Sequence, residues 1–171
     1  GYDARRELIG WSNPNYNDAS WWDVEVFAEK NAVLVATNGP AIKRQEELRA
    51  MPLHKIPALK PRWVFDMGQN MVGWVRLSVR GEKGTTIVIR YAEALNPDGT
   101  LYTTNLRTAR NMDFYTLKGD GDEIWEPRFT FHGFRYVEIT GLDVPPAPED
   151  VKGVVLGSDL PDTGDLRLSN P

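Results

Sequence analysis

The second half of the chain alternates between apolar and polar residues. Between residues 74 and 80, the aliphatic side chains Val75, Leu77 and Val79 alternate with Trp, Arg and Ser. A period of two with one apolar set is typical of a strand that buries one face. Further β segments are predicted at residues 85–95, 113–118, 124–131, 134–140 and 151–156, with a break at Gly133.

Turn signals separate these segments. Glycine, proline, asparagine and aspartate gather at residues 81–84, 96–99 and 119–122, and these residue types favour turn conformations. Short strands with turns every 8–12 residues indicate a sandwich, and no strand–helix alternation points to a parallel sheet. We therefore predict an all-β fold, an antiparallel β-sandwich or jelly roll.

The first third of the chain is less regular. Residues 13–21 are rich in Asn, Asp and Pro and predict turns, while β-branched runs predict strands at 24–27 and 32–37. Residues 41–50 have helical composition but too sparse an apolar stripe, so a helix and an edge strand both remain open. Prolines 52, 57 and 61 lie in or beside residues 54–61, which we interpret as an extended linker with a domain boundary near residue 58.

Composition excludes several classes of protein. The 171 residues include no Cys and two His, which excludes thiolate chemistry and leaves little for a histidine metal site. The net charge is -4 without a basic block, so nucleic acid is not an expected partner. No apolar run approaches the roughly 18 residues of a membrane span, so a membrane is not expected either.

Few catalytic patterns are present. Residues 119–121 carry an acid where a phosphate loop needs bare amides, and no serine lies in a nucleophile elbow. Asp120 and Asp122 fit a solvated turn better than a calcium loop. Glycosidases need two carboxylates, and Glu93, Glu126 and Glu138 lie on predicted strands, where the polar face of a sandwich is the simpler interpretation.

Aromatic and basic residues supply the binding candidates. Six Trp are present, and indole rings suit the apolar face of a sugar, although each more often packs in a core. His132 lies beside Gly133, where a bulge could direct it at a ligand, and Arg135 is expected to pair with a carboxylate or stack on an aromatic ring. The candidates for carbohydrate binding or a domain interface are Trp74, Trp125, His132 and Arg135.

Several longer motifs resemble those of bacterial α-L-rhamnosidases of glycoside hydrolase family 78. They are FDMGQNMVGW at 65–74, RYAEALNPDGTLY at 90–102, NLR at 105–107, WEPRFTFHGFRYVE at 125–138 and SDLP at 158–161. The motifs YDAR at 2–5, Gly10-Trp11 and DASW at 18–21 resemble the end of the preceding N-terminal sandwich. The resemblance follows nearly the whole chain in order.

This resemblance implies a domain layout. Residues 1–58 would be a remnant of the N-terminal β-sandwich plus a linker, 59–158 the concanavalin-like β-sandwich, and 159–171 the start of a linker to an (α/α)₆ catalytic barrel. In that family an acid and a base in the barrel hydrolyse terminal α-L-rhamnosyl linkages with inversion. No position here matches a catalytic motif, so we assign no catalytic residue and expect a piece of a longer protein that is inactive alone.

Three hypotheses follow. The first is a non-catalytic accessory sandwich that packs on the barrel, and the alternative is a module that binds rhamnosyl glycosides. The third, an enzyme in its own right, requires two close carboxylates in a cleft. The resemblance implies no cofactor, and calcium stays possible without an assigned residue. The sequence assigns no cellular compartment.

Overall fold

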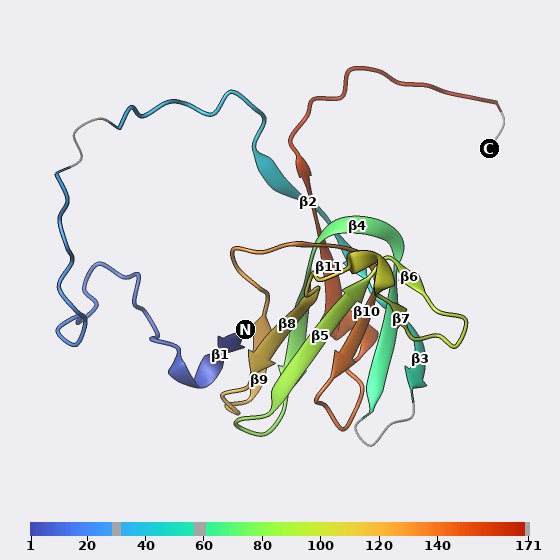
Figure 1. Ribbon diagram of the computed structural model, residues 1–171, viewed down its shortest axis with the longest axis horizontal. Coiled ribbons are helices and arrows are strands. Elements are labelled where there is room, and N and C mark those ends of the chain that lie inside the picture. The colour runs from blue at the N-terminus through green and yellow to red at the C-terminus, as the bar shows by residue number, and fades with distance from the viewer. Residues whose placement is uncertain (29–31, 57–60, 170–171) are drawn as a thin grey trace.

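The computed structural model describes residues 1–28, 32–56 and 61–169, and Figure 1 shows their arrangement. Apart from short 3₁₀ turns, the regular elements of this part of the chain are strands. The strands are β1 (Tyr2–Asp3), β2 (Ile42–Arg49), β3 (Met51–Ile56), β4 (Arg62–Arg80), β5 (Thr86–Ala92), β6 (Ala94–Leu95), β7 (Leu101–Tyr102), β8 (Met112–Thr116), β9 (Asp122–Trp125), β10 (His132–Thr140) and β11 (Val151–Ser158). The 3₁₀ turns are η1 (Ala4–Arg6), η2 (Thr104–Leu106) and η3 (Pro148–Asp150).

The long strand β4 belongs to two layers of one curled sheet. Its first part, residues 62–66, pairs with β10 on one side and β3 on the other. Its second part pairs with β11 at residues 73–77 and with β9 at residues 77–80. The sheet continues from β10 through β5 to β8 in one layer, and from β11 to β2 in the other. The strand order is therefore β1-β8-β5-β10-β4-β11-β2, with β3 and β9 beside β4.

The main core lies between the two layers. Inward side chains of β5 and β10, such as Tyr91 and Phe134, share one buried cluster with Val75 of β4 and Val151 of β11. Because β5 and β11 are not neighbours in the sheet, this shared cluster shows that the curled sheet packs against itself. Complete burial of a side chain such as Phe134 contributes about 1.5–3 kcal/mol.

Gly73 allows β4 and β11, the two strands at the centre of this curl, to approach each other closely. A Cβ atom at residue 73 would lie 1.9 Å from the carbonyl oxygen of Val154 on β11. Only glycine fits such a contact, so the crossing of β4 into the second layer depends on this residue.

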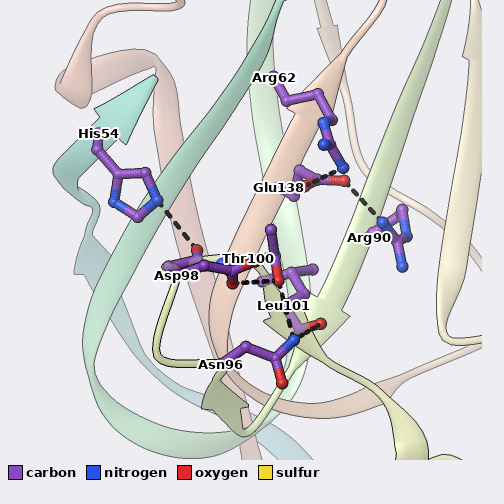
Figure 2. Close-up of polar contacts among 9 residues, drawn as sticks. His54, Arg62, Arg90, Asn96, Asp98, Thr100, Leu101 and Glu138 are labelled. Atoms are coloured by element: carbon purple, nitrogen blue, oxygen red, sulfur yellow. Dashed lines mark hydrogen bonds and ion pairs between the residues drawn. The ribbon is translucent and has the colours of Figure 1, made fainter. Parts of the chain in front are cut away.

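The β6–β7 hairpin covers part of the outer face of the first layer. Leu101 packs there with Val64 and Ala92 in a second, smaller cluster. The Asn96 amide donates to Thr100 Oγ1 at 2.9 Å, and His54 of β3 contacts the Gly99 carbonyl oxygen at 3.0 Å (Figure 2). These contacts attach the tip of the hairpin to the neighbouring strand.

The predicted all-β sandwich is confirmed, whereas several local predictions are corrected. Residues 24–27 and 32–37 form no strand, because no described segment lies beside them to supply hydrogen bonds. Of the two alternatives for residues 41–50, the strand is the one observed, as β2. The predicted extended linker includes part of strand β3. The strand predicted at 124–131 ends at Trp125, and β10 runs through Gly133 without the predicted break.

The predicted domain boundary at residue 58 lies outside the described residues. Strands β2 and β3 precede it, yet they pair with β11 and β4 on its other side. Among the residues that the structure describes, no helix has the length and apolar character needed to span a membrane.

Candidate functional site

The four predicted candidates lie in different surroundings. Trp74 is on the outer face of the second layer, and Trp125 is at the end of β9 beside the core. His132 points into the core from the start of β10, and Arg135 lies at an irregularity of β10, where the pairing register with β4 shifts. The structure therefore brings Trp74 and Trp125 near one loop, and uses the other two residues elsewhere.

Glu126 is the centre of a polar cluster on the second layer. Its carboxylate accepts hydrogen bonds from Trp74 Nε1 at 2.9 Å, Arg76 Nε at 3.1 Å and Arg44 at 2.7 Å. Burial alone would raise the pKa of Glu126, but the Trp74 hydrogen bond and the two guanidinium groups lower it below its usual value. Glu126 therefore stays ionised, which is unsuitable for a general acid.

A groove of about 640 Å³ runs beside this cluster. It lies between the N-terminal residues and the loop that follows β9, and its lining includes Tyr2, Trp11, Arg76, Trp125, Arg128 and Phe129. One face of Trp125 is stacked on Tyr115 with ring centroids 4.9 Å apart. The volume is in the range of small-molecule sites, which is roughly 300–1,000 Å³.

The acidic residue Glu123, below the groove, has a structural role. It accepts hydrogen bonds from the Tyr115 hydroxyl at 2.8 Å and from the backbone N–H groups of Lys118 and Gly119 at 3.0 and 2.8 Å. Burial would raise its pKa, but these donors lower it. The carboxylate thus caps the turn between β8 and β9.

His132 is part of a buried triad of side chains. Its ring stacks on Tyr91 with centroids 4.1 Å apart, and its Nε2 lies 2.9 Å from Asp113 Oδ2. The same oxygen accepts a hydrogen bond from the Tyr91 hydroxyl at 2.7 Å. Burial has the largest effect on the pKa of Tyr91, and together with the charge of Asp113 it raises this pKa well above its usual value. All three groups satisfy one another, so His132 is held in the core rather than directed at a ligand.

Arg135 makes a two-pronged ion pair on the outer face of the first layer. Its Nε and one terminal nitrogen lie 2.9 and 2.8 Å from the two oxygens of Asp66, and its guanidinium lies 5.2 Å from the Tyr136 ring centroid. Asp66 also accepts the Gly68 N–H at 2.7 Å. The guanidinium of Arg135 holds the pKa of Asp66 below its usual value, despite burial.

The other two carboxylates considered for hydrolysis, Glu93 and Glu138, each contact a different set of side chains. Glu138 is 1% exposed and lies between Arg90 at 2.8 Å and Arg62 at 3.5 Å (Figure 2). Glu93 is exposed and accepts from the amides of Asn70 and Asn105. In the described contacts, no partner is shared between any two of Glu93, Glu126 and Glu138.

No metal site emerges from the described residues. Nowhere in residues 1–28, 32–56 and 61–169 do three or more His, Asp or Glu side chains lie close enough to hold an ion. Calcium, which the sequence leaves possible without an assigned residue, is not tested by this arrangement.

Sequence reasoning missed Asp113, Arg44 and Phe129. The pattern predicts Asp113 only as the start of a strand, and Arg44 lies 82 residues before its partner Glu126. Phe129 adopts a positive φ of 62°. The residue types around Phe129 carry no signal for that conformation.

The chain is similar to proteins of one family along its whole length. The model of the bacterial alpha-L-rhamnosidase concanavalin-like domain matches residues 58–157, and that of the alpha-L-rhamnosidase N-terminal domain matches residues 1–46. An alpha-L-rhamnosidase of Streptomyces avermitilis is 46% identical over 174 residues, covering 99% of this chain and 16% of the relative. One from Formosa agariphila is 37% identical over 172 residues, covering 99% of this chain and 18% of the relative.

Solved structures agree with the fold. The Streptomyces avermitilis alpha-L-rhamnosidase complexed with L-rhamnose superimposes with a TM-score of 0.83 at 48% identity, over 94% of this chain and 16% of that one. The native enzyme of Aspergillus terreus gives a TM-score of 0.86 at 37% identity, over 99% of this chain and 20% of that one. The chain therefore spans only 16–20% of the length of these relatives.

Proposed function

Because the chain belongs to the bacterial α-L-rhamnosidase family, we propose that it is a non-catalytic accessory β-sandwich of such an enzyme. It packs on and supports the (α/α)₆ barrel in which terminal α-L-rhamnosyl linkages are hydrolysed with inversion. The match of residues 58–157 to the concanavalin-like domain of the family carries this proposal.

The state of the carboxylates supports a non-catalytic role. An inverting glycosidase needs one protonated and one ionised carboxyl group about 6.5–9.5 Å apart across a sugar. Glu126 is ionised and held by three donors, and Glu138 is enclosed between two arginines. Neither is available for proton transfer to a bound substrate.

A chimeric enzyme tests this function. The Streptomyces avermitilis enzyme would be produced in three forms: intact, without the region that aligns with this chain, and with that region replaced by this chain. We expect the chimera to hydrolyse an aryl α-L-rhamnoside and to melt near the intact enzyme, and the deletion to lose activity and stability. A deletion that retains both, or an inactive chimera, would contradict the proposal.

The groove beside Trp125 favours a second candidate function, carbohydrate binding. It combines the aromatic rings of Tyr2, Trp11 and Trp125 with charged side chains, as sugar sites do. Titration of the ¹⁵N-labelled chain with L-rhamnose, with D-glucose as control, tests this candidate. Saturable shifts around Trp125 that glucose does not produce would support it, and no shifts at tens of millimolar rhamnose would refute it.

A further inference from the structure

Backbone strain is concentrated in two loops. Within the described residues, Arg107 and Phe129 are the two non-glycine residues with positive φ, at 55° and 62°. A left-handed conformation is disfavoured for a residue with a bulky side chain, and it persists only where the surroundings impose it. Such strain is often found at functional loops, so the two loops that contain these residues, 103–111 and 126–131, merit a functional explanation.

Both loops lie at one end of the sandwich. Each leads into a strand, 103–111 into β8 and 126–131 into β10, and both strands are antiparallel to β5 between them. The two strands therefore begin at the same end (Figure 1). Two contacts join their starts: Asn111 Nδ2 donates to the Gly133 carbonyl at 3.3 Å, and His132 contacts Asp113. We call this surface, residues 103–111 and 126–131, the loop end.

The loop end exposes large apolar side chains. Phe129 is fully exposed at 105% and Phe131 is 65% exposed. The strained backbone at Phe129 destabilises the free chain, and the exposed ring contributes no burial energy to offset that strain. Burial of the ring in a partner would offset the strain, and buried aromatic anchors typically dominate the energy of an interface.

The charge of the loop end is opposite to that of the whole chain. Arg107, Arg110 and Arg128 are exposed, and no ion pair joins them to a carboxylate of the described residues. The chain as a whole carries a net charge of -4. An acidic partner therefore complements this end electrostatically, and complementarity of this kind sets orientation and specificity.

The exit of the C-terminal segment and the length of the relatives favour another domain of the same enzyme as the partner. Strand β11 runs antiparallel to the second part of β4 and ends at Ser158, and residues 159–168 leave the sandwich near the loop end (Figure 1). Figure 1 shows that these residues then extend away from the sandwich. The relatives are also far longer than this chain, which covers 16–20% of their length.

We propose that the loop end is the docking surface for the catalytic domain of the same enzyme. The matching face of that domain offers an apolar socket for Phe129 and Phe131 and carboxylates for the three arginines. This inference rests on the proposed accessory function and adds the surface that performs it.

Hydrogen–deuterium exchange on the chimeric enzyme tests the location. We expect amides of residues 103–111 and 126–131 to exchange at least about tenfold more slowly in the chimera than in the isolated chain. The loop at residues 141–147, at the opposite end, should exchange equally in both. An active chimera whose loop end exchanges as fast as in the isolated chain would overturn the docking surface alone, whereas an inactive chimera would overturn the proposed function.

A substitution at Phe129 gives effects of opposite sign in the two proteins. Asparagine tolerates the left-handed conformation, so Phe129→Asn should leave the melting temperature of the isolated chain unchanged or raise it by about 1–4 °C. In the chimera the same change should lower the melting temperature and abolish the protection of the loop end. Val144→Asn, an exposed control at the other end, should do neither.

Charge reversal tests the electrostatic part independently. Arg128→Glu should remove protection in the chimera more strongly than Arg128→Gln, whereas Arg80→Glu at the far end of β4 should have no effect. Equal behaviour of the Phe129, Arg128 and control variants in the chimera would overturn the proposal.

Discussion

Replacement of Asp113 by alanine is expected to destabilise the sandwich strongly. One carboxylate oxygen accepts from both the Tyr91 hydroxyl at 2.7 Å and the His132 ring at 2.9 Å. Tyr91 is fully buried and His132 is 8% exposed, so water does not readily replace the lost acceptor. Each buried polar group left without a partner costs about 1–3 kcal/mol, which gives about 4 kcal/mol for Asp113→Ala.

Thermal unfolding followed by circular dichroism measures this effect. For a domain of this size, about 4 kcal/mol corresponds to a fall of about 8–16 °C in melting temperature. Asp122→Ala removes an ion pair with Arg80 in which both side chains are 71% exposed, and it should cost less than about 1 kcal/mol. That variant is the matched control.

A double-mutant cycle separates the hydrogen bond from general damage. In the wild-type background Tyr91→Phe removes a satisfied hydroxyl and should destabilise the chain. In the Asp113→Ala background the same change removes an unpaired hydroxyl and should be neutral or stabilising, so that the two substitutions couple by about 1–3 kcal/mol. A loss below about 1 kcal/mol for Asp113→Ala, or additive effects, would refute Asp113 as the buried acceptor that holds the triad together.

Two further predictions concern the close approach of β4 and β11 and the loss of stability at low pH. Gly73→Ala places a Cβ 1.9 Å from the Val154 carbonyl and should cost more than about 3 kcal/mol, whereas Gly39→Ala, with nothing within 4 Å, should melt like the wild type. Arg135 lowers the pKa of Asp66 below its usual 3.8, so their pairing stabilises the chain fully above about pH 4 and is lost as pH falls through the lower, folded-state pKa. Urea unfolding between about pH 5 and pH 2 should show a shallower acid loss in Arg135→Gln than in wild type, and parallel curves would contradict this role of the pair.

The strands that bury one face could be predicted from the sequence. Val75, Leu77 and Val79 are all buried in β4, as their alternation indicated. The period of two also places His132 on the same face as buried Phe134, so a strand that continues through Gly133 would have predicted its burial.

The unpaired segments could not be predicted in the same way. Val24, Val26 and Val35 have high β propensity, yet they are exposed and form no strand. β propensity expresses how a residue fits a paired, half-buried surface, and here no described neighbour provides one. Local composition therefore overestimated the strand content of residues 24–37.

Only part of the candidate site could be predicted from the sequence. The aromatic character of Trp125 makes it a binding candidate, and this residue lines a groove. The ion cluster of Glu126 joins Arg44, Trp74 and Arg76 from distant parts of the chain, and only the pairing of β2, β4 and β11 brings them together. The positive φ of Phe129 likewise follows from tertiary contacts rather than from residue type.

Hydrolysis of an aryl α-L-rhamnoside by the 171-residue chain, assayed beside the chimeric enzyme, tests the central claim most directly. An accessory role predicts no rate above the uncatalysed reaction for the chain alone, and a rate comparable to the intact relative for the chimera. Hydrolysis by the chain alone that Glu93→Gln or Glu126→Gln abolishes would contradict the claim and would make the chain an enzyme in its own right.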